Sequence, residues 1–135
     1  MNKVITILLL CFLLVSCASD IPKTVTVCEE ESMLNHFYVD YDTVHIICSI
    51  TVVNDSLNDV EFTISAVSKE DTQNGLLMYP ELTGINAETQ NSVFSLNSGT
   101  KATFHVDFQG RYGGTECKVD RLIPDVIELQ ILPNE

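Results

Sequence analysis

The strongest constraint on the fold is an alternation of apolar and polar residues through positions 44–67. Successive side chains of a β-strand point to opposite faces, so a strand with one buried face is apolar at every second position. Residues 44–52 and 60–67 both follow this rule, and the polar segment 54–59 separates them. The pattern predicts two antiparallel strands joined by a polar turn, as a hairpin. The residues expected to face the core are Val44, Ile46, Cys48, Ile50, Val52, Phe62, Ile64 and Ala66.

A second hairpin is predicted over residues 93–108, where apolar alternation resumes on both sides of Asn97-Ser98-Gly99. Gly99 can adopt the positive φ that such turns often need. Residues 24–28 and 126–132 alternate in the same way, and no segment keeps helical spacing for ten residues. The predicted fold is a single, all-β, immunoglobulin-like antiparallel β-sandwich of about seven strands. The inward residues expected from the later strands are Phe94, Leu96, Phe104, Val106, Phe108, Ile127, Leu129 and Ile131.

The segments ITVVN, VEFTI and FSLNSGTKATFHVDF, within residues 49–108, resemble the strands of bacterial immunoglobulin-like domains. The resemblance covers about half of the mature chain and implies a fold class only. Two departures stand out. The chain has no tryptophan, and Cys48 has no cysteine partner at the inward positions of residues 104–108, so the immunoglobulin disulfide is absent.

The first residues have the order of an export signal. Lys3 precedes an apolar run from Val4 to Val15, and small residues surround Cys17. A charged residue, an apolar run and a group of small residues follow one another in the order typical of a signal peptide. The run of about twelve residues is shorter than the roughly twenty that a membrane-spanning helix needs.

The tetrapeptide Leu14-Val15-Ser16-Cys17 resembles the lipobox of bacterial lipoproteins. The resemblance implies cleavage before Cys17, a diacylglyceryl thioether on its sulfur and palmitate-type acyl chains that hold the protein on the cell membrane or the outer membrane. An ordinary secretory signal is the alternative. The expected organisation is a signal peptide over 1–16, a lipidated tether over 17–23 and a β-sandwich domain over 24–135.

The charge of the mature chain excludes one class of partner. The precursor has 7 basic and 19 acidic residues, and Lys3 is the only charged residue in the signal, which leaves 6 and 19. A protein this acidic repels phosphate backbones, so we expect no nucleic-acid binding.

Three thiols remain after the signal is removed and Cys17 is lipidated: Cys28, Cys48 and Cys117. An odd number permits one disulfide and one free thiol, or three free thiols. A disulfide between Cys28 and Cys117, with Cys48 as a buried thiol, is the favoured pairing.

Two long connections, 69–91 and 110–124, are the candidate functional loops, because long ordered loops often carry function. The second loop offers a cationic and aromatic recognition patch, or else its cations neutralise Glu116, Asp120 and Asp125. If the first loop contains no crossing strand, both loops share one end of the sandwich; a full strand over 76–79 would place them at opposite ends. The candidate binding residues are Arg111, Tyr112, Lys118 and Arg121.

Metal and catalytic sites are weakly indicated. His45 and Cys48 are three apart, so on a strand they face opposite sides and do not form a zinc pair. Asp40 and Asp42, and the polar segment 54–59, contain calcium-type ligands, but the second is also typical of a turn. His105 and Asp107 share a strand face without any nucleophile elbow. We expect no metal, no cofactor and no catalytic residue.

These features together predict a lipid-anchored, non-enzymatic module that binds an envelope protein or glycan, and that contacts the membrane through the lipid on Cys17. A structural accessory subunit of an envelope assembly, using a sheet edge or face, is the alternative. An envelope enzyme is a third and weaker possibility.

Overall fold

The computed structural model describes residues 25–115 and 123–133, which form seven strands and one short helix. Several predicted features lie outside these residues: the signal peptide, Cys17, Cys117, Lys118 and Arg121. No helix within the described ranges is long and apolar enough to cross a bilayer. The elements are β1 (Val25–Asp40), β2 (Thr43–Asn54), β3 (Val60–Val67), α2 (Lys69–Gln73), β4 (Glu81–Asn86), β5 (Phe94–Leu96), β6 (Lys101–Arg111) and β7 (Val126–Ile131).

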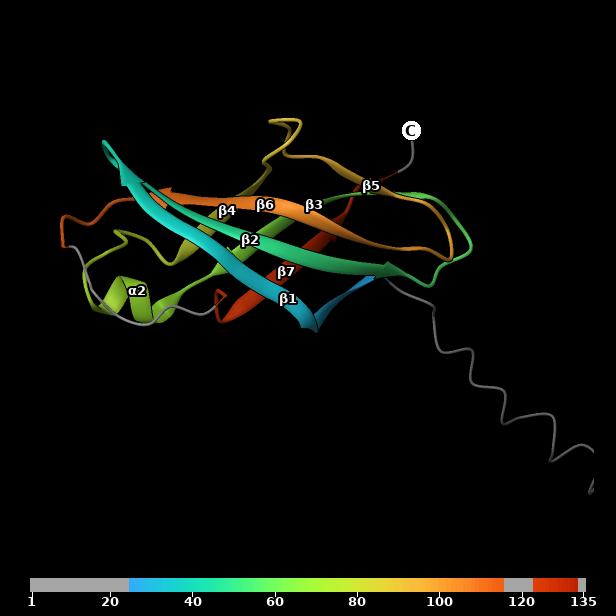
Figure 1. Ribbon diagram of the computed structural model, residues 1–135, viewed down its shortest axis with the longest axis horizontal. Coiled ribbons are helices and arrows are strands. Elements are labelled where there is room, and N and C mark those ends of the chain that lie inside the picture. Colours follow the sequence, from blue (N-terminus) through green and yellow to red (C-terminus); the bar gives the residue numbers. More distant parts are fainter. Residues whose placement is uncertain (1–24, 116–122, 134–135) are drawn as a thin grey trace, which may run out of the picture.

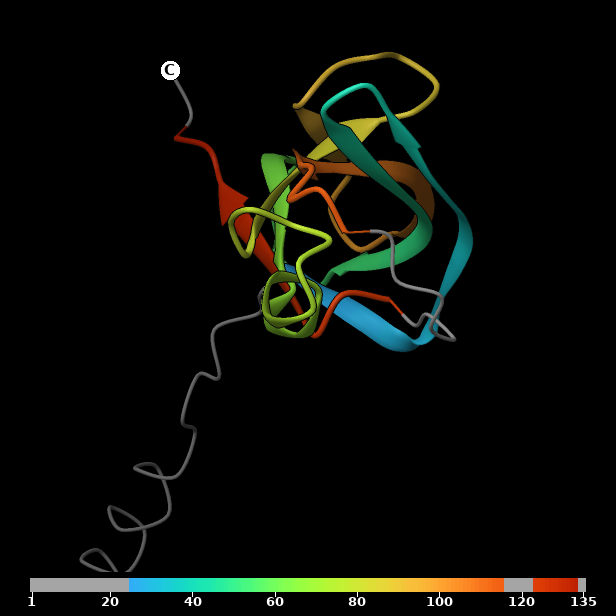
Figure 2. The same cartoon turned by 90° about the vertical axis from the view of Figure 1, so that its left-hand side faces the viewer.

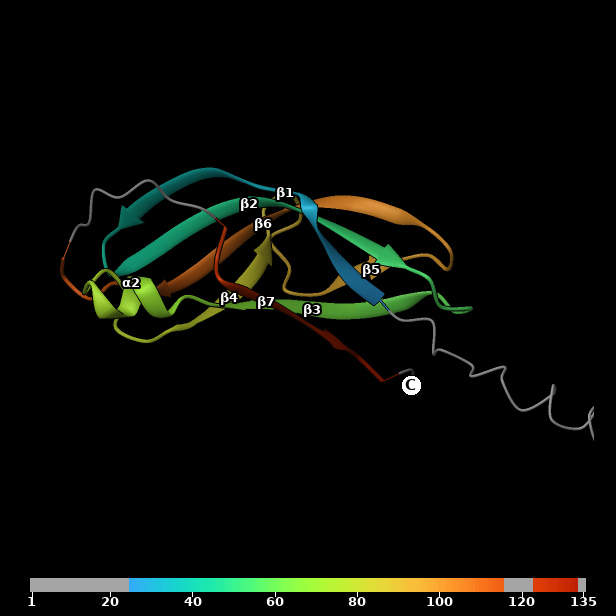
Figure 3. The ribbon, with the colours of Figure 1, turned by 90° about the horizontal axis from the view of Figure 1, so that it is seen from below.

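The strands form one antiparallel sheet that folds over into two layers (Figures 1 and 3). Strands β1, β2 and β6 make one layer, and β3 makes the other with β5 and β7. Strand β4 belongs to both layers, because its first half pairs with β3 and its second half pairs with β6. The end-on view shows the strands arranged round a central core (Figure 2). The predicted all-β, sandwich-like fold is confirmed.

The core contains the side chains that the alternation selects. All five predicted residues of β2 and all three of β3 are buried. Phe62 and Phe94 stack at 5.8 Å between ring centroids, and Phe104 meets Phe94 edge-on at 5.4 Å. Three rings in offset or edge contact at this spacing add packing energy beyond their buried area. The core therefore joins the two layers through aromatic contacts.

Both predicted hairpins are wrong. Strand β2 pairs with β1 and β6 but not with β3, and β5 pairs with β3 but not with β6, in the part of the chain that the structure describes. The connections 55–59 and 97–100 are arches that carry the chain from one layer to the other. An arch and a hairpin bury the same alternate residues, so the inward residues of these strands were predicted correctly and their pairing was not. On β7 the prediction was wrong for Ile131, which is 47% exposed at the end of the strand.

The two arches lie side by side and are joined by hydrogen bonds. The backbone N–H of Asn54 donates to Thr100 O at 2.9 Å, and that of Gly99 donates to Asn54 O at 2.8 Å. Gly99 has a φ of 68°, as predicted for this turn. Asn54 is fully buried, and its side chain bonds to Asn58 in the first arch and to Leu96, the last residue of β5 before the second. We call this end of the sandwich the arch end.

Strand β1 is longer than the predicted 24–28. It continues through the acidic residues 29–31 to Asp40 along the edge of the sheet, with register shifts between Cys28 and Met33 and between Leu34 and His36. Irregularities of this kind on an edge strand discourage pairing with another chain.

The connection 69–91 contains α2 and β4, and its residues 76–79 form no strand. Strand β4 can pass between the layers because Gly84 leaves room for it: a Cβ there would lie 2.4 Å from Ile64 O. Since β4 does not run the length of the sandwich, β3 and β6 finish at the same end. The first of the two predicted loop arrangements is therefore the one observed.

Candidate functional site

The two long loops meet at the end opposite the arches. The backbone N–H of Met78 donates to Arg111 O at 2.9 Å, and that of Gly113 donates to Leu76 O at 2.7 Å. Leu77 and Tyr112 form an isolated antiparallel bridge. Gly113 permits this approach, because a Cβ there would lie 2.4 Å from Gly75 O. The segments 75–79 and 111–115 therefore form one continuous surface.

The β1–β2 turn joins the same surface through a hydrogen bond from Tyr112 N to Asp42 O at 2.7 Å. We call residues 41–42, 75–79 and 111–115 together the loop surface. It carries large exposed side chains: Tyr41 is 95% exposed, Tyr79 56% and Met78 45%. Tyr and Met are enriched at protein interfaces relative to the rest of a protein surface.

The predicted binding residues divide into three groups. Arg111 is exposed on the loop surface. Tyr112 is half-buried and packs against the core, so part of its ring has a structural role. Lys118 and Arg121 lie outside the described residues, as do Glu116 and Asp120 of the charge-neutralisation alternative. Within the described ranges, the two ion pairs are His45–Asp107 and Lys101–Glu31, and neither includes Arg111.

A polar hollow of about 390 Å³ adjoins the loop surface beside Arg111. The sequence indicated Asp42 only as a calcium-type ligand. It gave no sign that Thr43, Thr83 or Gln109 belongs to a site. The alternation gave the outward position of Gln109 but not that of Thr83, since β4 was not predicted, and their proximity depends on strand pairing. The lining residues are Asp42, Thr43, Thr83, Gln109, Gly110 and Arg111.

Asp107 pairs with His45 and not with His105, which shares its strand face. His45 Nδ1 lies 2.8 Å from Asp107 Oδ2, and Gln109 Nε2 donates to the same oxygen at 2.9 Å. The Tyr38 ring stacks on His45 at 4.5 Å between centroids. The strand register explains the difference, because His45 and Gln109 are opposite each other on β2 and β6. Asp107 therefore holds Gln109 at the edge of the polar hollow.

His105 has a different partner, since its Nδ1 lies 3.3 Å from Ser49 Oγ. Ser49 also accepts a hydrogen bond from Asn35 Nδ2 at 2.7 Å. These side chains are exposed on the outer face of the sheet.

Cys48 is fully buried in the core, and burial raises the pKa of its thiol to about 12. A thiol in this state stays protonated at neutral pH and is a poor nucleophile. It also faces inward while His105 faces outward, so the two do not form a dyad. Cys28 is half-buried on β1; because Cys117 is outside the described residues, their disulfide stays a prediction.

Glu31 and Lys101 form the second ion pair, with Nζ and Oε1 2.9 Å apart. The hydrogen bond and positive charge of Lys101 hold the pKa of Glu31 below its usual value. Both side chains are about half exposed, so the pair adds little to stability.

The polar segment 54–59 uses its side chains to hold the arches. Asn54 Oδ1 accepts from Ser56 N at 3.0 Å, and Asp59 Oδ1 accepts from Ser98 N at 2.8 Å. These contacts are those of a polar turn, the favoured interpretation. No cluster of three or more His, Cys, Asp or Glu residues suited to a metal ion occurs in residues 25–115 and 123–133.

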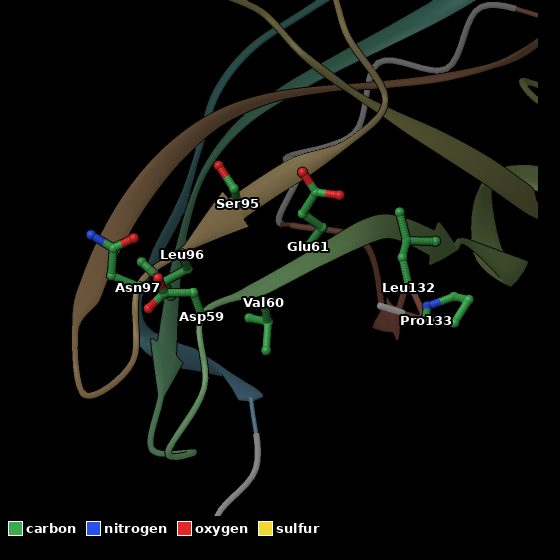
Figure 4. Close-up of a pocket in the computed structure, with 8 residues that line it drawn as sticks. All are labelled: Asp59, Val60, Glu61, Ser95, Leu96, Asn97, Leu132 and Pro133. Atoms are coloured by element: carbon green, nitrogen blue, oxygen red, sulfur yellow. The ribbon is translucent and has the colours of Figure 1, made fainter. Parts of the chain in front are cut away.

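A larger hollow of about 860 Å³ lies at the arch end, beside the first residues of β3 (Figure 4). The chain after β7 borders it and is held to β3 by a hydrogen bond from Leu132 N to Glu61 O at 2.8 Å. It therefore lies at the other end of the molecule from the loop surface. Its lining residues are Asp59, Val60, Glu61, Ser95, Leu96, Asn97, Leu132 and Pro133.

No protein-family model, curated protein or solved structure matches the chain.

Proposed function

We propose that the protein is a lipid-anchored, non-enzymatic binding module of the bacterial cell envelope that engages a protein or glycan through its loop surface. One observation carries this proposal: the described chain begins at the end opposite the loop surface. Val25, the first residue of β1, is opposite Asn54 at the arch end, whereas Thr43 at the other end of β2 is opposite Arg111. Strand β2 has 12 residues, so the two ends are about 40 Å apart.

The predicted lipid anchor on Cys17 would orient the two ends of the domain relative to the membrane. Cys17 precedes Val25 by eight residues, which span at most about 28 Å when fully extended. A lipid on Cys17 therefore keeps the arch end near the bilayer. The loop surface then points away from the membrane, where a partner can reach it.

The side chains on the loop surface suit recognition. Tyrosine and arginine often supply most of the binding energy of an interface. The loop surface combines Tyr41, Tyr79 and Arg111 in a protein whose remaining surface is strongly acidic. A patch that departs from the rest of the surface in this way supports binding of a specific partner.

A triple variant tests the loop surface. The full chain carrying Tyr41→Ser, Tyr79→Ser and Arg111→Ser is expected to retain less than about one tenth of the envelope material captured by the wild type, because interface centres dominate affinity. Capture from detergent-solubilised envelope extracts onto the tagged full chain, quantified band by band, measures this.

Leu57→Ser is the matched control, because Leu57 is 85% exposed in the arch 55–59 and far from the loops. It should leave capture unchanged. Equal capture by wild type and triple variant would refute the loop surface, and an equal loss in the Leu57 variant would show non-specific apolar adhesion instead.

The lipid anchor has its own test. We expect Cys17→Ser to abolish incorporation of a palmitate analogue and to move the protein from the membrane fraction to the soluble fraction, since the thioether requires the cysteine sulfur. In-gel detection of the analogue, with membrane fractionation of the same cells, gives the readout. Cys11→Ser, within the predicted signal, should keep both label and membrane location; continued labelling of Cys17→Ser would contradict the lipobox prediction.

The accessory-subunit alternative uses a different part of the molecule. Strand β7 pairs on one side with β3, and its Val126 and Ile131 are about half exposed. An exposed strand edge can accept a further strand from a partner. Capture that survives the loop-surface triple variant but is lost on Ile131→Pro would favour this alternative, because the N–H of Ile131 lies on the edge of β7 away from β3 and proline removes it.

A further inference from the structure

We propose that the polar hollow beside Arg111 is a subsite for a carboxylate-bearing sugar residue, such as a uronic acid within a glycan. This inference rests on the proposed function and adds the chemical class of the ligand. The geometry that carries it is the convergence of one arginine, two threonines, an amide and a carboxylate in a hollow of about 390 Å³. That volume is at the lower end of the range found for small-molecule sites.

Arg111 supplies the carboxylate preference. The described ranges contain three lysine or arginine residues: Lys69 on α2, Lys101 paired with Glu31, and Arg111 in the hollow. A guanidinium presents a planar pair of donors that matches a carboxylate, and such bidentate contacts are among the stronger hydrogen bonds in proteins. The Arg111 backbone is fixed by the pairing of β6 with Thr43 and by the bond from Met78 N. The root of the Arg111 side chain is therefore fixed at the border of the hollow.

The other lining groups suit a polyhydroxylated ligand. No apolar side chain lines the hollow. Thr83 offers a hydroxyl that donates and accepts. The Thr43 hydroxyl donates to Asp42 Oδ1 at 3.3 Å and accepts from a ligand, and the second oxygen of Asp42 offers an acceptor for sugar hydroxyls. Gln109 is oriented by its bond to Asp107, which His45 holds in turn, so its amide oxygen is available as an acceptor. Most drug-like ligands instead occupy pockets lined mainly by apolar side chains.

Tyr41 supplies an aromatic face next to this polar set. It precedes Asp42 in the turn and is 95% exposed, with a φ of 52°. Positive φ is unusual for a bulky residue, and backbone conformations of this kind cluster at ligand clamps. In a two-residue hairpin turn, the first position with positive φ is usually glycine. Retention of an exposed tyrosine there is explained by stacking of its ring on the apolar face of a sugar.

The test measures binding of the full chain, in detergent micelles, to short oligogalacturonates and to the same oligosaccharides after reduction of their carboxyl groups. We expect saturable binding of the acidic form and at least tenfold weaker binding of the reduced form, by isothermal titration calorimetry. Equal binding of the two forms, or no binding of the acidic form at 10 mM sugar, overturns the proposal. Binding of a short acidic peptide as tightly as the sugar also overturns it.

Matched variants locate the site. Arg111→Gln should weaken binding of the acidic form at least tenfold, while Lys69→Gln, which removes one positive charge at the same end but outside the hollow, should change it less than twofold. Tyr41→Asn should also weaken binding at least fivefold without lowering the melting temperature, because asparagine tolerates positive φ. Equal losses in the Arg111 and Lys69 variants would show a general charge effect and refute the site.

The experiments distinguish failure of the loop-surface proposal from failure of the sugar-subsite proposal. If oligogalacturonate does not bind but the triple variant still loses envelope capture, the ligand class is wrong and the loop surface stands. If the sugar binds in the hollow but capture is unaffected by the triple variant, the subsite stands and the proposed partner surface is wrong.

Discussion

Replacing Asn54 by alanine is expected to lower the free energy of unfolding by about 3 kcal/mol, since it removes one buried and three partly buried hydrogen bonds at once. The Asn54 side chain is fully buried and makes all four of them. Its Nδ2 donates to Asn58 O in one arch and to Leu96 O before the other. Its Oδ1 accepts from the backbone N–H and the hydroxyl of Ser56. Alanine leaves the buried Leu96 O without this donor and removes the bonds that hold Ser56 and Asn58 in the arch.

Urea unfolding of the full chain, followed by far-ultraviolet circular dichroism, measures this loss. Leu57→Ala in the same arch is the control, because Leu57 is 85% exposed and its loss should change stability by less than about 0.5 kcal/mol. A loss below about 1 kcal/mol for Asn54→Ala would show that the arches hold together without this side chain.

Replacing Gly84 by alanine should destabilise the protein by roughly 2–3 kcal/mol, the usual cost of forcing extra atoms into a packed core. A Cβ at this position would lie 2.4 Å from Ile64 O and 3.0 Å from Val106 Cγ1. The first contact is with backbone, which a rotamer change cannot relieve. Because β4 joins the two layers at this point, either β3 or β6 must move to make room.

Gly99→Ala is the comparison variant, because it measures the cost of a positive φ without any steric clash. Gly99 has a positive φ and nothing within 4 Å of its added Cβ, so we expect a loss near 1 kcal/mol, from backbone strain alone. Thermal unfolding of both variants gives the comparison. If Gly84→Ala were no more harmful than Gly99→Ala, β4 would not be packed as closely as described.

The alternation of β2 and β3 predicted the buried residues well, because a period of two follows from strand geometry alone. It did not predict which strands pair, since pairing depends on where each turn leads the chain. Strand β4 escaped prediction for a related reason: it is short, and one of its two buried positions is Gly84, which carries no apolar side chain. Helix α2 spans 5 residues, which is too few to show a helical period.

The candidate site shows the same limit. Arg111 was identified because it stands out in an acidic chain, whereas Thr43, Thr83 and Gln109 look like ordinary outward residues until β2, β4 and β6 are placed together. The sequence placed His105 and Asp107 on one strand face, because they are two residues apart. In the structure Asp107 instead contacts His45 on the neighbouring strand, which is 62 positions away in the sequence.

The opposite positions of Val25 and Arg111 also determine how the domain would carry mechanical load. Tension between an anchor before Val25 and a partner bound at Arg111 would run along β1, β2 and β6. The hydrogen bonds between antiparallel strands lie across this direction, so they would be loaded together in shear instead of being peeled apart one by one. A domain with this arrangement is suited to holding a partner against a pulling force.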